Sequence, residues 1–303
     1  MSAASAINQV GDVGQSRRLI REEAAIAQKY TRRVPWEMVA WGLTNFAVWL
    51  SLWPLTFMGI LPLWAAFLIS TLGCILAYLP SHDAQHQSIA RKGSKLHWVN
   101  ELVGHVSLIP IVLPYKLAWI EHREHHAHAN DPKHDPDFGF NGKNVWQAVW
   151  NGMKSRQPAA QDATFRMVVE QSNMPDIPRA IGEGALLNTT YYVILCGLAW
   201  SGFAIEAFFI WWLPRHIGLA YLTTCLGWAP HFPYEEMGRY RDTRAWKSPI
   251  GTILSMGMEY HQIHHLFPTI PLFQTGPAYW EMRGLLAKRG VRDDRPDALP
   301  TGS

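Results

Sequence analysis

An uncharged stretch near the start of the chain limits what the protein can fold into. The 44 residues from Met38 to Ser81 include no Asp, Glu, Lys or Arg. A helix that crosses a bilayer needs about 20 mostly apolar residues. This block is therefore long enough for two helices, with a turn marked by Pro54, Gly59 and Pro62. Only 17% of the chain is charged, compared with about 25% in a typical soluble protein, so the sequence favours a membrane protein.

A second long apolar block covers residues 184–230 and is predicted to hold two more transmembrane helices. Glu206 is expected at the turn between them. Arg215 falls inside the last helix, where a lone charge is awkward for a simple span. We expect either a kink at Pro214 or a side chain that reaches a membrane interface.

A shorter apolar stretch, residues 99–118, is interrupted by Glu101 and Pro110. It is predicted to form a helix or a re-entrant segment that returns to the face from which it entered. Residues 121–183 and 231–303 are polar and are expected to form a cap. The expected fold class is an all-α membrane protein with about four transmembrane helices and a cytosolic helical cap.

The same pattern predicts the domain organisation and the orientation. Residues 1–35 form a polar segment that could hold an interfacial helix, residues 36–290 form the membrane domain, and residues 291–303 form a polar tail. Four spans place both termini and the cap on one side. The first segment carries six Lys or Arg residues and the far-side turns carry none, and such residues mark the cytoplasmic side. We expect an integral protein of the bacterial inner membrane, with a cytoplasmic N-terminus, C-terminus and active site.

The composition also excludes several classes of protein. A net charge of +3 without a basic stripe gives no reason to expect a nucleic-acid partner. Cys74, Cys196 and Cys225 lie far apart in apolar surroundings, so they cannot form a CxxC zinc site or an iron–sulfur cluster. They are predicted to be small buried hydrophobic residues.

Eight of the 14 histidines in the chain lie in three short clusters. They are His82-x-x-x-His86, His122-x-x-His125-His126 and His261-x-x-His264-His265. Residues three and four apart share one helix face, and imidazole is a good ligand for iron, zinc or copper. Each cluster follows an apolar segment on the same predicted side, so we expect eight imidazoles to converge at the membrane surface. The zinc-protease signature HExxH is absent from the chain.

These three motifs, set among four predicted spans, resemble the integral-membrane fatty acid desaturase/hydroxylase superfamily over roughly residues 36–290. The resemblance implies two iron ions held by histidines, O2 as co-substrate, and no catalytic residue beyond the metal ligands. It also implies a ninth ligand, His231, about 30 residues before the third motif. The implied ligands are His82, His86, His122, His125, His126, His231, His261, His264 and His265. The segment Asp135–Phe138 resembles carotenoid ketolases, whereas residues 238–244 resemble carotene hydroxylases or desaturases.

Histidines that bind a metal usually donate their second N–H to a carboxylate or a carbonyl group. The carboxylates near the motifs are therefore predicted to orient the rings. These candidates are Asp83, Glu124, Asp135, Asp137, Glu235 and Glu259. His128 and His134 lie near the second motif but outside its spacing, and they are expected either at the surface or in contact with the ligand rings.

The predicted function is O2-dependent hydroxylation or ketolation of an unactivated C–H bond in a long apolar lipid or hydrocarbon. A lipid desaturase that uses the same site is the alternative. A more distant alternative is a zinc-dependent membrane hydrolase or a metal transporter. A transporter would place its polar ligands at mid-span, whereas the clustered histidines are predicted beyond the ends of the spans. The chain has no cysteine cluster and no GxGxxG motif. A separate reductase with a ferredoxin-like or rubredoxin-like carrier is therefore expected as a partner. Membrane lipid is the other expected partner.

Overall fold

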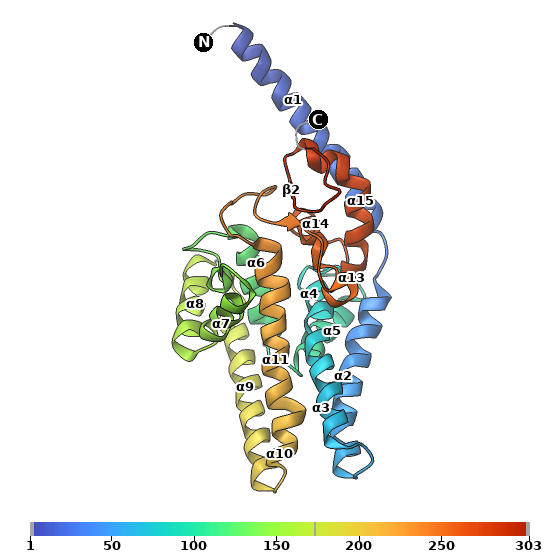
Figure 1. Ribbon diagram of the computed structural model, residues 1–303, viewed down its shortest axis with the longest axis vertical. Coiled ribbons are helices and arrows are strands. Elements are labelled where there is room, and N and C mark those ends of the chain that lie inside the picture. Colours follow the sequence, from blue (N-terminus) through green and yellow to red (C-terminus); the bar gives the residue numbers. More distant parts are fainter. Residues whose placement is uncertain (1–2, 173, 301–303) are drawn as a thin grey trace. The chain divides into compact units, whose positions relative to one another are not determined.

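The computed structural model describes residues 3–172 and 174–300, apart from the side chains of residues 3–15, 158 and 253. The chain divides into two compact units. The larger unit is Pro35–Gly238, and the smaller unit combines Met1–Val34 with Arg239–Ser303. Nearly all regular structure is helical (Figure 1). Within the described ranges the strands are β1 (Arg244–Ala245) and β2 (Arg292–Asp293), so the all-α class is confirmed.

The helices of the two units follow in chain order. The larger unit contains α2 (Trp36–Phe57), α3 (Leu63–Leu76), α4 (Tyr78–Gln85), α5 (His97–Leu108), α6 (Tyr115–His128), α7 (Val145–Ser155), α8 (Pro158–Gln171), α9 (Ile177–Trp200), α10 (Ala204–Ala207), α11 (Leu213–Leu222) and α12 (Ala229–His231). The smaller unit contains α1 (Ala3–Tyr30), α13 (Gly251–Leu254), α14 (His261–Leu266) and α15 (Leu272–Lys288).

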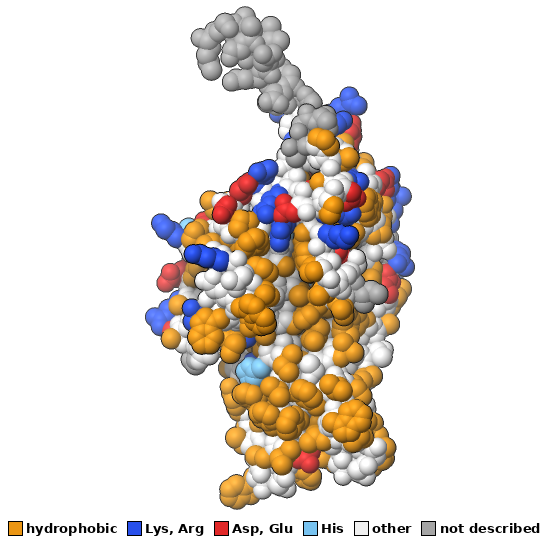
Figure 2. Space-filling model, viewed as in Figure 1, with side chains coloured by type: hydrophobic (Ala, Val, Ile, Leu, Met, Phe, Trp, Pro, Cys, Tyr) orange, Lys and Arg blue, Asp and Glu red, His pale blue; other side chains and the backbone are white. Residues whose placement is uncertain are grey.

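Two helical segments of the described chain are long and apolar enough to cross a membrane. They are α2 and the segment Leu63–Gln85, which joins α3 to α4. These are the two helices expected from the first apolar block, although Pro54 lies inside α2 rather than in the turn. Hydrophobic side chains cover the visible surface of the larger unit toward the turns at residues 58–62 and 201–203 (Figure 2). The count of four spans stays a prediction.

The segment from residue 204 to residue 231 is not a uniform α-helix. A π-helical turn at Phe208–Trp212 precedes α11, and a second one at Thr223–Trp228 precedes α12. Each turn ends two residues before a proline, Pro214 or Pro230. Proline cannot donate to the carbonyl one turn earlier, and a π turn inserts a residue where the hydrogen-bond ladder is interrupted. The distortion predicted at Pro214 therefore takes the form of a π turn.

The turn between α5 and α6 is buried and needs donors for its carbonyl groups. The indole Nε1 of Trp211 donates to the carbonyl of Pro110 at 3.0 Å. The guanidinium Nε of Arg215 donates to the carbonyl of Ile111 at 2.9 Å. Arg215 thus bonds to the backbone of a buried turn, and the expectation that its side chain reaches a membrane interface stays a prediction.

α3 packs against both α2 and α11. A Cβ atom at Gly218 of α11 would lie 2.8 Å from the Cβ atom of Cys74 on α3, so glycine permits this close approach. Cys74 and Cys225 are buried as predicted, but Cys196 is exposed. The prediction failed for Cys196 because the apolar outer face of α9 is itself exposed, as at Leu186 and Val193.

In the smaller unit, α1 packs along α15. Glu23 of α1 is buried, and its two oxygens accept hydrogen bonds from Arg289 at 3.1 Å and from Tyr240 at 3.0 Å. Arg295, in the segment that follows α15, lies over the ring of Trp280 at 4.3 Å. β1 pairs in parallel with β2, so this C-terminal segment is part of the smaller unit.

Candidate metal centre

The first cluster joins the ends of two helices in the larger unit. His82 lies in α4 and His86 directly after it, while His122 lies in α6. Their ligand nitrogens all lie within 4.8 Å of one another. His126, one turn after His122, places its Nε2 atom 3.1 Å from that of His122. The spacing of the first two motifs therefore gathers four buried or half-buried imidazoles at one place.

The second cluster pairs α6 with α12. The Nε2 atoms of His125 and His231 lie 3.2 Å apart, and both side chains are buried. The ring centroid of His125 lies 6.0 Å from that of His122, and its Nε2 atom faces His231. The second motif is thus divided between two clusters, which the linear pattern did not predict.

Asp135 fixes the orientation of the His125 ring. Its Oδ1 atom accepts hydrogen bonds from His125 Nδ1 and from the backbone N–H of Asp137, each at 2.8 Å. Its Oδ2 atom accepts from the backbone N–H of Asn130 at 2.8 Å. Because the carboxylate holds the proton on Nδ1, the lone pair of Nε2 points toward His231.

The two aspartates beside His125 differ in their pKa. Burial works to raise the pKa of Asp135, but the charge and hydrogen bond of His125 outweigh burial and hold it below its ordinary value. Asp137 lies 3.7 Å from His125 Nδ1. Burial and the neighbouring charge of Asp135 raise the pKa of Asp137 to about 6. Asp135 is therefore ionised at neutral pH and accepts the hydrogen bond from the ring as a carboxylate.

The other predicted carboxylates have different surroundings. Glu124 lies 3.7 Å from His128, which belongs to no motif, and Glu235 is exposed. Asp83 is buried in α4. Glu259 is buried and accepts a hydrogen bond from the backbone N–H of Ser248 at 3.0 Å.

The third motif forms α14 in the smaller unit. The Nε2 atoms of His261 and His265 lie 3.1 Å apart, and the ring of His264 lies 5.1 Å from that of His261. On the opposite helix face, Ile263 and Leu266 are buried in the hydrophobic core of this unit. That core holds the helix so that the three imidazoles share one side, as the HxxHH spacing predicts.

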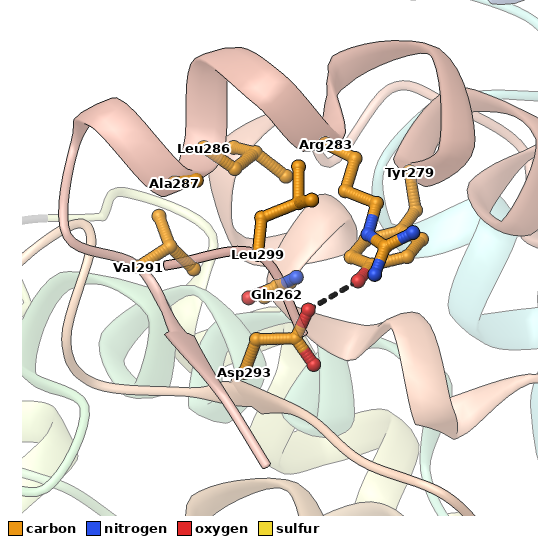
Figure 3. A pocket seen from close by; sticks show the side chains of 8 residues that line it. All are labelled: Gln262, Tyr279, Arg283, Leu286, Ala287, Val291, Asp293 and Leu299. Atoms are coloured by element: carbon orange, nitrogen blue, oxygen red, sulfur yellow. Dashed lines mark hydrogen bonds between the residues drawn. The ribbon is translucent and has the colours of Figure 1, made fainter. Parts of the chain in front are cut away.

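A small pocket of the smaller unit lies beside the third motif (Figure 3). Gln262, the neighbour of His261, contributes its buried amide. The hydroxyl of Tyr279 donates to the carboxylate of Asp293, and Arg283 approaches from α15. The pocket mixes these polar groups with apolar side chains and contains no histidine, so it is not part of the candidate metal centre.

The donor geometry fits a transition-metal ion. Two nitrogens bound to one ion at about 2.1 Å lie roughly 3.0–3.4 Å apart, and the Nε2 pairs in the three clusters are 3.1, 3.2 and 3.1 Å apart. Burial, together with neighbouring positive charge, lowers the pKa of His86 and His122 well below its ordinary value. These rings are therefore neutral at physiological pH, which is the form that coordinates a metal.

Comparison with known proteins agrees with this arrangement. Residues 58–296 match the model of the fatty acid desaturase family. An sn-1 oleoyl-lipid 12-desaturase of Anabaena variabilis is 22% identical over 67% of this chain and 63% of its own length. An sn-1 acyl-lipid omega-3 desaturase (ferredoxin) of Nostoc is 25% identical over 72% of this chain and 67% of its own length.

A third relative is matched over a shorter region. A zeaxanthin 4-ketolase of Chlamydomonas reinhardtii is 32% identical over 74 residues, which is 24% of this chain and 16% of that protein. The chain spans less than two thirds of the length of the Anabaena relative. The family model nevertheless covers most of the chain, including all three histidine motifs and His231. The chain therefore belongs to the fatty acid desaturase family.

Proposed function

We propose that this protein is a membrane-bound non-haem di-iron oxidoreductase that uses O2 to oxidise an unactivated C–H bond in a long apolar lipid. The observation that carries the proposal is the pair of histidine clusters on α4, α6 and α12, since each has the nitrogen spacing of a metal site. The family match supports the same chemistry. The third motif would supply the remaining ligands, as the resemblance implies.

The proposed ligand set is the one expected from the sequence. It comprises His82, His86, His122, His125, His126, His231, His261, His264 and His265. Iron, when bound, would supply the activation of O2 that no side chain can provide. The chain itself would orient the ligands, chiefly through the contact of Asp135 with His125, and would exclude stray water by burial.

Desaturation is the reaction outcome that the relatives favour. The Anabaena and Nostoc proteins are named as lipid desaturases and are matched over 67% and 72% of this chain. In that outcome a –CH2–CH2– unit, O2, two electrons and two protons give a –CH=CH– unit and two water molecules. We propose an acyl chain of a membrane lipid as the substrate class.

Oxygen insertion, as hydroxylation or ketolation, is the second candidate. The match to the zeaxanthin 4-ketolase and the Asp135–Phe138 segment support it. Mass spectrometry of lipids from expressing cells separates the two outcomes. Desaturation removes two hydrogen atoms from the product, whereas hydroxylation adds one oxygen atom.

The proposed reaction also needs a source of electrons. The three cysteines are free, and Cys74 and Cys225 lie in separate buried positions, so these residues form no iron–sulfur cluster. We propose a ferredoxin-like or rubredoxin-like carrier with its reductase. The Nostoc relative, whose name includes ferredoxin, supports the first of these.

Substitution of single histidines tests the proposed ligands. We expect His125→Ala and His264→Ala to abolish turnover and lower the iron content while the protein stays in the membrane. His134→Ala is a matched control, because that ring is half-exposed and contacts Asp131. Full activity and full iron content in both ligand variants would exclude the assignment. Bound zinc with activity that needs no reductant would instead favour a membrane hydrolase.

A further inference from the structure

Arg156 and Arg215 are half-buried in the larger unit, and neither has a carboxylate partner among the residues that the structure describes. Arg156 follows α7 and donates through Nη1 to the hydroxyl of Thr223 at 3.0 Å and to the carbonyl of Leu219 at 3.4 Å. Arg215 in α11 donates through Nε to the carbonyl of Ile111 at 2.9 Å. All three acceptors are uncharged, and the other partner of Arg215 is the neutral ring of Tyr191, whose centroid lies 5.6 Å from its guanidinium carbon, so no anion balances either positive charge in these contacts.

The two guanidinium groups lie along one face of α11. Positions 215, 219 and 223 are spaced by four residues, which places them on the same side of the helix. Arg156 contacts the backbone of Leu219 and the side chain of Thr223, so its guanidinium lies beside α11 about one to two turns beyond position 215. Burial and the positive charge of Arg215 hold the pKa of Arg156 below its ordinary value.

Close packing fixes α7 beside this face. Ala148 and Gly152 are the buried positions of α7. A Cβ atom at Gly152 would lie 2.4 Å from the Cγ2 atom of Thr223. The end of α7, and with it the backbone of Arg156, is therefore held against the π turn that follows α11.

The opposite face of α7 is an exposed apolar stripe. Trp146, Trp150 and Met153 are spaced at four and three residues and are 80%, 59% and 46% exposed. Lys143 and Lys154 are exposed near the two ends of the helix. An amphipathic helix with tryptophan on one face and flanking lysines is typical of a helix that lies in the plane of a membrane interface. This would place Arg156 at the depth of the lipid headgroups.

We propose that Arg156 and Arg215 bind the phosphate group of an anionic membrane lipid where α7 meets α11. A half-buried positive charge in apolar surroundings is costly without a counter-ion. A guanidinium carries five N–H donors, and the described contacts use one nitrogen of each arginine. Phosphate oxygens match the planar fork of the donors that remain. The inference rests on the membrane disposition of the proposed function but not on the metal or the reaction.

Thermal unfolding of the purified full chain in a neutral detergent tests this site. Phosphatidylglycerol, phosphatidylcholine and inorganic phosphate are added separately. At a concentration near 100 times its Kd, phosphatidylglycerol should raise the midpoint of the wild type by about 5 °C. The rise should be lost in Arg156→Gln and kept in Arg166→Gln, because Arg166 is exposed and already paired with Asp162.

The possible outcomes separate the sources of the anion. An equal rise with phosphatidylcholine, or an undiminished rise in Arg156→Gln, overturns the proposal. An equal rise with inorganic phosphate alone overturns the lipid as the source. Native mass spectrometry gives a second measurement: the wild type should retain phosphatidylglycerol, and Arg156→Lys, which keeps the charge but loses the fork, should retain less. Iron content of the same samples shows separately whether the proposed metal site fails.

Discussion

A single carboxylate illustrates how the candidate centre is organised at the scale of one residue. Asp135 accepts hydrogen bonds from two backbone N–H groups and from the His125 ring. The backbone contacts hold the carboxylate in place whether or not the ring is present. The orientation of His125 is therefore determined by the fold of the loop after α6.

Replacing Asp135 by Asn tests this role. The amide has only one oxygen, so it cannot accept all three hydrogen bonds, and it no longer favours a proton on Nδ1 of His125. We expect iron affinity to fall by roughly 10- to 100-fold, measured by equilibrium dialysis against a chelator. Asp131→Asn is the control, because that half-buried carboxylate contacts the non-motif ring of His134. Equal loss in both variants would mean that Asp135 has no specific effect.

A second residue-scale prediction concerns pH. Burial works to raise the pKa of Asp294, but hydrogen bonds from Arg244 and Arg292 outweigh it and the pKa lies below its ordinary value. Its contribution to stability is therefore present above about pH 4 and is lost as the pH falls through the lowered pKa. We expect the free energy of unfolding of the wild type to exceed that of Asp294→Asn by about 1 kcal/mol at pH 6. This difference should shrink toward zero as the pH falls to 3.

Hydrogen exchange at β1 and β2 across this pH range measures the gap within the smaller unit. The backbone N–H of Asp294 itself donates to the carbonyl of Ala245 at 2.9 Å, so the local amides report on this contact. A difference between wild type and variant that stays constant from pH 6 to pH 3 would contradict the prediction.

At the scale of secondary structure, two glycines with equal helix propensity have opposite surroundings. A Cβ atom at Gly152 of α7 would overlap Thr223, whereas one at Gly182 of α9 would meet nothing within 4 Å. We expect Gly152→Ala to destabilise the protein by about 1–3 kcal/mol through overpacking. Gly182→Ala should be neutral or stabilising by up to about 1 kcal/mol, because alanine favours the helix. Thermal unfolding in detergent compares the two variants. Equal shifts in the midpoint would mean that Thr223 moves aside at no cost when position 152 gains a Cβ atom.

The sequence predicted the helical class, the first pair of apolar helices and the side-by-side histidines within each motif. These follow from periodicity, which is local. It could not select Asp135 from six carboxylates, since the choice depends on how the loop after α6 turns back. The sequence also could not show that His122 and His125 belong to different clusters, or that the side chain of Cys196 is exposed. Those outcomes depend on packing between distant segments.

At the scale of the whole molecule, the proposed orientation can be tested with reporter fusions in a bacterial host. Four spans would place the turns at residues 58–62 and 201–203 outside the cytoplasm and both termini inside. We expect alkaline phosphatase to be active when fused after Gly59 or Gly202, and green fluorescent protein to fluoresce when fused at the C-terminus. An inactive fusion after Gly202 with an active one after Gly59 would contradict the second pair of spans.

The one-turn segment of α6 that carries His122 and His125 serves both clusters of the larger unit. Three residues of α-helix advance by about 4.5 Å. The spacing between the two clusters along α6 is therefore set by the geometry of the helix. Removing one residue between these histidines would rotate His125 and His126 by about 100° relative to His122, so both clusters would be disturbed together. An engineer who wishes to retune one of them therefore has to work from α4 or α12, because the shared helix offers no independent adjustment.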